Sequence, residues 1–182
     1  MGVRSFVRRH RLSVAVTGFV AAAGLAFGLF WFAPWQLFLD KKVDEALPSV
    51  RTAAATKTEA QPGGRLTLAA GEFRSLEHES SGRALILRLS DGSRYLRFED
   101  LNTSNGPDLR VLLSVHPLDD DWHVWDDQEF LDLGGLKGNI GDQNYLLPND
   151  FALSKYRTAV VWCRRFHVGF AVVPLDPVPG ST

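Results

Sequence analysis

The longest pattern in the chain is an apolar run near the N-terminus. Residues 12–39 contain no Asp, Glu, Lys or Arg. About 20 apolar residues in a helix are enough to cross the hydrocarbon core of a bilayer. Aromatic rings favour the headgroup level, and the far end of the run holds a group of them: Phe30, Trp31, Phe32 and Trp35. The pattern therefore predicts one transmembrane helix over residues 12–39.

The charges around this run predict its orientation. Residues 1–11 carry four arginines and no acidic residue. Because basic flanks stay in the cytoplasm, we expect a cytoplasmic tail over residues 1–11 and an extracytoplasmic C-terminal part at the plasma membrane. The alternative is a cleaved signal peptide, whose apolar core is normally only about 7–15 residues long. The small residues at 21–24 lie in mid-run, and Ala33 precedes Pro34, so we favour an uncleaved anchor.

A polar stretch follows the apolar run. Residues 40–65 are rich in Ala, Thr, Lys and Glu, are interrupted by Pro48 and Pro62, and offer little apolar surface for packing. They predict a flexible spacer, in which residues 43–47 are an option for a short helix.

From residue 66 the pattern changes to short apolar runs separated by turn residues. Asp91-Gly92 is typical of a tight hairpin turn, and Asn105 to Asp108 is typical of a wider one. The expected strands are residues 66–69, 71–77, 83–89, 93–98, 109–115, 129–133, 159–163 and 166–173. We therefore predict an all-β fold, an antiparallel β-sandwich or barrel-like domain over residues 66–175, followed by a tail over residues 176–182.

The last two strands hold the only cysteine. Residues 159–163 are apolar without a break, and apolar side chains alternate from Phe166 onward. A hairpin here places Cys163 beside Arg164 and Arg165 and near His167. Positive neighbours lower the pKa of a thiol, so Cys163 is the candidate redox residue and the other three are candidates for lowering its pKa. The alternative is a buried Cys163 that acts as a small hydrophobic side chain.

Composition removes several classes of function. A single cysteine excludes an internal disulfide framework, a multi-cysteine zinc or iron–sulfur site, and covalent haem attachment. Beyond residue 11, 16 basic residues stand against 21 acidic ones, which argues against nucleic acid as a partner. No cofactor is evident. Copper on Cys163, His167 and His78 is a remote option, as is noncovalent haem on His78, His116, His123 or His167.

The most acidic stretch is residues 116–127, HPLDDDWHVWDD. Several carboxylates could hold calcium, but their spacing matches no EF-hand loop. We expect a solvated loop and predict no metal site.

Four segments in this order resemble one family. They are Gly71-Glu72-Phe73, FEDLNTSNGPDLRVLLS at residues 98–114, LGGLKGNIGDQNYLLP at residues 133–148, and VVWCRRFHVGFAVVPL at residues 160–175. Together they resemble the electron-transfer DM-thirteen domain family. The resemblance implies a small extracytoplasmic β domain in which Cys163 is the redox residue, close to membrane electron-transfer proteins. The matching positions besides Cys163 are His78, Gly106, Pro107, Asp108, Gly138, Asn139, Tyr145, Pro148 and Trp162.

Two hypotheses follow. In the first, the chain is a redox or electron-transfer accessory of a membrane redox protein, with Cys163 as its active group. In the second, it is a non-catalytic cell-surface binding module with a structural cysteine, in which loops around Asp108, Trp122 and Trp125 contact a partner. Neither hypothesis makes the chain a stand-alone enzyme.

Overall fold

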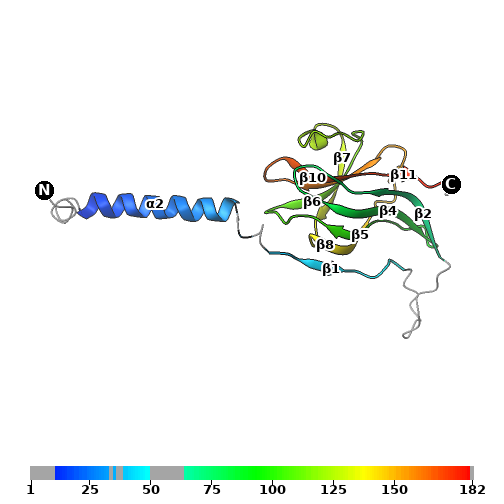
Figure 1. Ribbon diagram of the computed structural model, residues 1–182, viewed down its shortest axis with the longest axis horizontal. Coiled ribbons are helices and arrows are strands. Elements are labelled where there is room, and N and C mark those ends of the chain that lie inside the picture. Colours follow the sequence, from blue (N-terminus) through cyan, green and yellow to red (C-terminus); the bar gives the residue numbers. More distant parts are fainter. Residues whose placement is uncertain (1–10, 33–34, 36–38, 50–63, 181–182) are drawn as a thin grey trace, which may run out of the picture.

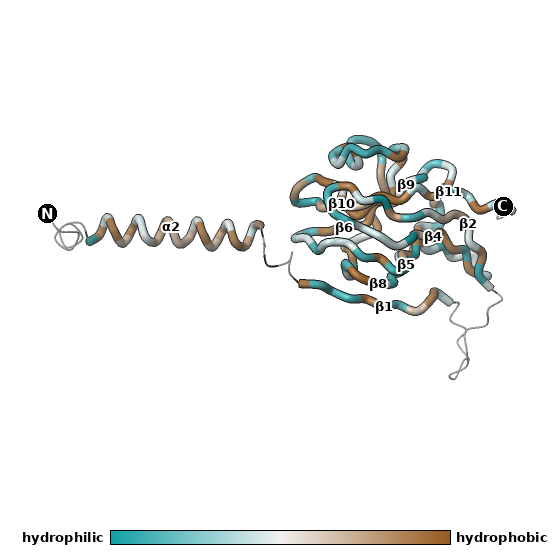
Figure 2. Tube along the Cα trace, in the orientation of Figure 1, coloured by the Kyte–Doolittle hydropathy of each residue, from teal (hydrophilic) through white to brown (hydrophobic). Residues whose placement is uncertain are grey.

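The computed structural model describes residues 11–32, 35, 39–49 and 64–180. One helix, α2 (Arg11–Phe32), extends away from a domain built of two β-sheets (Figure 1). The helix has no buried residue and is brown over much of its length in Figure 2, which marks apolar residues. By length and composition it can cross a membrane, and a signal sequence would fit the same test. The predicted all-β domain behind one apolar helix is confirmed.

Some of the predicted segments extend beyond the described residues. These are most of the basic tail, residues 33–34 and 36–38 of the predicted span, residues 50–63 of the predicted spacer, and residues 181–182.

The first sheet has six strands in the order β1-β8-β5-β4-β2-β11. They are β1 (Lys42–Asp44), β8 (Ile140–Leu146), β5 (Arg94–Asn102), β4 (Ser81–Leu89), β2 (Arg65–Glu72) and β11 (Asp176–Pro177). All neighbouring pairs are antiparallel except β1 and β8, which are parallel.

The second sheet has five strands in the order β3-β10-β9-β6-β7. They are β3 (Arg74–Ser75), β10 (Val168–Pro174), β9 (Thr158–Cys163), β6 (Leu109–Ser114) and β7 (Phe130–Gly135). A 3-10 helix, η2 (Val124–Asp126), lies in the loop between β6 and β7.

The core lies between the two sheets, and β9 runs through its centre. Ala159, Val161 and Cys163 face the main core, whereas Val160 and Trp162 face the other side of the sheet. There the loop that carries Trp125 covers them, so every residue of β9 is buried. This covering explains why β9 is apolar without alternation.

Several strands differ from the prediction. β2 continues across the gap between the two strands predicted over residues 66–69 and 71–77, and β11 lies inside the predicted tail over residues 176–182. β8 lies where no strand was predicted, and β1 lies inside the predicted spacer. The short helix that was an option over residues 43–47 is not formed, because β1 pairs with β8 in the register Lys42 to Ile140 and Val43 to Gly141. The Glu45 carboxylate continues this contact by accepting hydrogen bonds from Lys137 Nζ at 2.7 Å and from the Asn144 backbone N–H at 2.7 Å.

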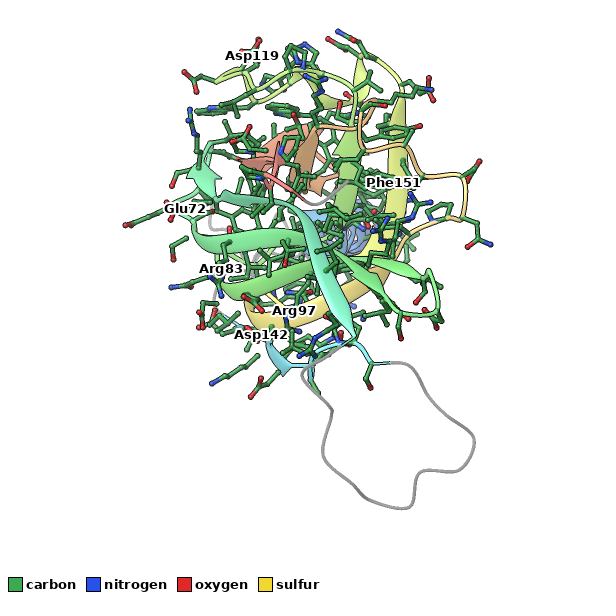
Figure 3. All side chains as sticks on the ribbon, turned by 90° about the vertical axis from the view of Figure 1, so that its right-hand side faces the viewer. Glu72, Arg83, Arg97, Asp119, Asp142 and Phe151 are labelled. Carbon is green, nitrogen blue, oxygen red and sulfur yellow. The ribbon has the colours of Figure 1, made fainter. Side chains whose placement is uncertain are left out.

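A charged network fastens β1 to the sheet. Arg97 is only 3% exposed although it points away from the main core. Its guanidinium group donates to Glu99 at 2.8 Å, to Asp142, to the Asn144 side chain at 2.9 Å and to the Glu45 carbonyl at 3.0 Å. In Figure 3, Arg97 and Asp142 lie together beside Arg83, near β1. The network therefore joins β5, β8 and the segment that follows β1.

This arrangement predicts a loss of stability in acid. Burial raises the pKa of the Glu45 carboxyl, but the hydrogen bonds from Lys137 and Asn144 outweigh that effect and hold the pKa below its ordinary value. The contribution of Glu45 is therefore complete above the unfolded-state pKa, about 4.3, and is lost as the pH falls through the lower folded value. Thermal unfolding of the full chain in detergent, followed from pH 7 downward, measures this loss.

The Glu45→Gln variant should be less stable at neutral pH and should depend less on pH than the natural chain. Glu72→Gln is the control, because Glu72 is exposed and forms no salt bridge among the described residues. Identical pH profiles for the natural chain and Glu45→Gln would contradict the assignment.

Candidate functional site

One end of the sandwich gathers most of the predicted site residues, and we call it the proximal end because it meets α2. It consists of the loops at residues 76–80, 103–108 and 136–139 and the β9–β10 turn at residues 164–167 (Figure 1). Hydrogen bonds tie these loops together. Ser80 and Thr103 share one at 2.7 Å between their hydroxyls, the Thr103 N–H donates to the Asn139 carbonyl at 3.0 Å, and the Arg164 N–H donates to the Asp108 carbonyl at 3.0 Å.

Cys163 is the last residue of β9 and lies at this end. It pairs with Val168 of β10 on one side and with Leu109 of β6 on the other. The side chain is 0% exposed and belongs to the main core. The Phe166 N–H donates to the Cys163 carbonyl at 3.2 Å, which closes the turn over the cysteine. The thiol therefore lies inside the proximal end and does not contact solvent.

The electrostatics of the thiol follow from this position. Burial raises the pKa of the Cys163 thiol above its ordinary value. The backbone N–H groups of Phe166, Arg165 and Asp108 oppose this pKa rise more weakly, and the negative charge of Asp108 adds to it. In this conformation Cys163 is a protonated thiol at neutral pH.

We expected Arg164, Arg165 and His167 to lower the pKa of the Cys163 thiol, but that pKa is raised. Arg164 Nε donates to the Asp108 carboxylate at 2.9 Å, and Arg165 donates to the carbonyl of Trp31 in α2. His167 Nδ1 lies 3.0 Å from the Asp126 carboxylate, on the side of the sheet opposite the thiol. The three side chains are neighbours of Cys163 in sequence, but each is turned toward another partner.

The proposed copper ligands are not brought together either. His167 packs against Trp162 on the outer face of the sheet, whereas Cys163 faces the core. His78 packs against Phe170, with 4.1 Å between the ring centroids and 54° between the ring planes. Within the described ranges, no group of three or more His, Cys, Asp or Glu side chains is placed to hold a metal ion. His116 and His123 lie in the β6–β7 loop, where their Nδ1 atoms contact the Pro117 and His167 carbonyls at 2.8 Å.

The acidic loop uses its carboxylates locally. Asp119 accepts from the Asp121 N–H and Asp121 accepts from the His123 N–H, both at 2.9 Å. Trp125 is fully buried under this loop, whereas Trp122 is exposed. The loop is therefore organised as a cover for the outer face of β9.

Residues of the predicted motif fix the loops around Cys163. The Asn105 side-chain oxygen accepts from the Gly106 N–H at 2.9 Å, and its side-chain nitrogen donates to the Leu39 carbonyl at 2.7 Å. A side chain at Gly106 would press on Phe170, since a Cβ there would lie 3.1 Å from the ring. Pro107 follows, and Asp108 is the partner of Arg164.

Gly138 and Asn139 contact residues 40 and 41, which belong to the segment that leads from the helix to the sandwich. Buried Asn139 accepts from the Lys41 N–H at 2.7 Å and donates to the Asp40 carboxylate at 2.9 Å. A Cβ at Gly138 would lie 2.3 Å from the Lys41 carbonyl oxygen. These motif residues therefore create room and hydrogen bonds for residues 40 and 41.

Of the remaining motif residues, Tyr145 contacts the 136–139 loop, where its hydroxyl accepts from the Lys137 N–H at 3.1 Å, whereas Pro148 and Trp162 lie away from the thiol. Tyr145 is buried in β8, its hydroxyl donates to Gln143 at 2.7 Å, and burial raises its pKa. Pro148 follows β8 at the far end of the sandwich, and Trp162 faces the second core cluster. These three residues support the fold.

Sequence reasoning missed two residues that hold this region. Gln143 is fully buried, accepts from the Lys137 N–H at 3.0 Å and donates to the Gly138 carbonyl at 2.8 Å, so it shapes the 136–139 loop. Arg97 is the centre of the network below β1. The only sequence signal was a pair of polar alternations, Arg97 with Glu99 and Asp142 with Asn144, on strands that pair in the structure.

Comparison with protein families gives one finding. The family described as electron transfer DM13 matches residues 72–175, more than half of the chain. The chain belongs to the electron transfer DM13 family. The DM13 match begins at the end of β2 and includes all four loops of the proximal end, but not the segment that leads from α2. Curated proteins and solved structures gave no match.

Proposed function

We propose that the chain is a membrane-anchored electron-transfer accessory. Its DM13 domain stands on the extracytoplasmic side of the plasma membrane, and Cys163 is its redox-active residue. Membership in the DM13 family supports a redox-related role. The observation that carries the choice of residue is the position of Cys163, enclosed at the proximal end by motif loops and close to α2.

The anchor and its orientation rest on the N-terminal sequence. The helix α2 is apolar and has no buried residue, as a lipid-facing helix would. Basic residues precede it and none of the first 11 residues is acidic, which favours a cytoplasmic N-terminus.

The redox step that suits a single cysteine is exchange with a disulfide of a membrane partner. The thiol loses its proton, and the thiolate sulfur attacks one sulfur of the partner's disulfide. A new S–S bond forms, the partner's S–S bond breaks, and its second sulfur leaves as a thiolate that takes up the proton. Cys163 is oxidised and the partner's second sulfur is reduced, so the partner's disulfide is the oxidant.

The turn over Cys163 controls this step. A buried thiol with a raised pKa does not react while the turn stays closed. Arg164 and Phe166 are exposed on that turn, and the ion pair of Arg164 with Asp108 holds it in place. A partner that engages the turn can therefore uncover the sulfur.

The second candidate is a non-catalytic binding module, and one observation favours it. The Cys163 side chain packs in the apolar core with Leu109, Val168 and Phe170 and has no exposed surface. In that case the cysteine is a core residue, and function lies in the exposed loops.

Alkylation of Cys163 in the full chain, in detergent micelles, tests the proposal. We expect slow labelling in the native protein, with a midpoint above the ordinary thiol pKa of about 8.5, and fast labelling in denaturant. The Arg164→Gln variant should label several-fold faster, because the link from the turn to Asp108 is lost. Arg83→Gln is the matched control: it removes the Arg83–Glu99 pair, whose arginine is as exposed as Arg164 but lies on β4 of the other sheet.

The two functions give opposite results. Formation of a mixed disulfide with a small aromatic disulfide in the folded chain, accelerated by Arg164→Gln, supports the redox role. Labelling only after global unfolding, unchanged by Arg164→Gln, would favour the binding module and reject Cys163 as a redox residue.

A further inference from the structure

The exposed turn at the proximal end touches the end of the helix. Arg165 donates to the Trp31 carbonyl, and its guanidinium carbon lies 5.3 Å from the centre of the Trp31 ring. The Phe166 ring stacks on Phe32, with 6.0 Å between centroids and 19° between planes. Phe166 is still 40% exposed, so part of an aromatic ring next to the helix end faces outward.

The chain between the helix and the sandwich is short. Six residues separate Phe32 from Leu39, and an extended chain of six residues spans at most about 20 Å. Leu39 is already bonded to Asn105, and the next residues are held by Asn139 and by pairing with β8. Because residues 39–44 are held on the sandwich, the proximal end stays within a short distance of the end of α2.

The length of the helix sets the depth of this contact. The 22 residues of α2 cover about 33 Å at 1.5 Å per residue, and the hydrocarbon core is about 30 Å thick. When α2 spans the bilayer, Trp31 and Phe32 reach the interface where aromatic rings are favoured. Arg165 and Phe166, which contact them, then lie at the same level.

The two side chains suit that environment. Arg164 is paired with Asp108, but Arg165 makes no salt bridge among the described residues. A guanidinium group with free N–H donors binds phosphate oxygens well. A phenylalanine ring gains from leaving water at the boundary between headgroups and acyl chains.

We propose that the β9–β10 turn is a second membrane contact of this chain, with Phe166 at the headgroup–acyl boundary and Arg165 bound to a lipid phosphate. This inference rests on the proposed membrane anchor. It concerns the same turn that covers Cys163, so a redox partner that engages the turn would have to lie at the membrane surface. It makes the proximal end a face that lies on the lipid surface.

Fluorescent probes at single cysteines test the contact. The full chain, with Cys163→Ser, is reconstituted in vesicles of phosphatidylcholine and phosphatidylglycerol, and Phe166→Cys carries a polarity-sensitive fluorophore. Asp91→Cys, in the β4–β5 turn at the far end of the sandwich, is the matched control for a solvent-exposed turn. Val20→Cys, inside α2, reports on the anchor itself.

We expect blue-shifted emission at position 166 and loss of most of its fluorescence when nitroxides are placed on the lipid headgroups, with neither effect at position 91. If the probe at position 20 is in lipid but the probe at position 166 gives the same emission and quenching as the one at position 91, the inference is wrong and the membrane anchor is still supported. If position 20 reports water, the anchor and the inference both fail. A probe at 166 that is shielded from water but not quenched by the lipid nitroxides indicates contact with a second copy and overturns the inference.

A second readout leaves Cys163 unchanged. A photoreactive benzophenone side chain at position 166 of the full chain should crosslink to lipid, and the same group at position 91 should not. Crosslinking at 166 to protein alone would overturn the proposal.

Discussion

Replacing Arg97 with leucine is expected to lower the free energy of unfolding by about 3–5 kcal/mol. The guanidinium group is buried and satisfies Glu99, Asp142 and the Glu45 carbonyl at once. Without it, the Asp142 carboxylate loses its salt bridge, and the Glu99 carboxylate keeps only the exposed Arg83. Urea unfolding of the full chain in mild detergent, followed by tryptophan fluorescence, measures the loss.

Arg83→Leu is the matched control for this prediction. Arg83 binds the same Glu99 carboxylate from the outside, but its side chain is 60% exposed. An exposed pair contributes less than about 1 kcal/mol, so this variant should unfold almost like the natural protein. Adding Glu99→Leu and Asp142→Leu to Arg97→Leu should recover part of the lost stability, because the uncompensated charges are removed. Equal effects of Arg97→Leu and Arg83→Leu would contradict the role given to the network.

Replacing Gly141 with alanine is expected to release β1 from the sheet. Gly141 has φ of +96°, and a Cβ there would lie 2.1 Å from the Val43 carbonyl oxygen. The new methyl group and the β1 backbone cannot occupy the same space. The positive φ costs alanine a further ~1–2 kcal/mol. We expect a total loss of at least about 2 kcal/mol from these two effects.

Hydrogen exchange separates release of β1 from general unfolding. In Gly141→Ala the amides of Glu45 and Ile140, which bond across the β1–β8 contact, should exchange fast, while those of β9 stay protected. Gly92→Ala is the control, since Gly92 also has a positive φ, +87°, but has no atom within 4 Å of the added Cβ. Gly92→Ala should lose the stability that a positive φ costs alanine, but its Glu45 amide should exchange as slowly as in the natural chain. Protected Glu45 and Ile140 amides in Gly141→Ala would refute the steric explanation.

The features predicted well from sequence were those that hydrophobicity alone determines. The helix followed from a run without charges, and the hairpin of β9 and β10 followed from apolar residues on both sides of two arginines. β8 was missed because Gly141, Asp142 and Asn144 interrupt any alternation. Those residues are polar or small because they face β1 and Arg97, and β1 itself is too short and too charged to predict a strand.

The environment of Cys163 was harder to predict for a related reason. Sequence placed Arg164 and Arg165 beside the cysteine, but side-chain direction depends on contacts that are distant in sequence. Arg164 finds Asp108, 56 positions earlier, and Arg165 finds Trp31, 134 positions earlier. The thiol is left with apolar neighbours, and this reverses the expected direction of its pKa change.

The parallel pairing of β1 has a consequence for assembly. A sheet edge with unpaired N–H and C=O groups is a template for strands of other molecules, and β1 closes that edge of β8 from within the same chain. Because the closing strand is tethered, its local concentration at β8 exceeds that of any free strand. Anchored copies share one two-dimensional surface, so a released β1 would meet the open edge of a neighbour. Weakening this pairing should therefore favour exchange of β1 between neighbouring chains, and crowding in the membrane should add to that exchange.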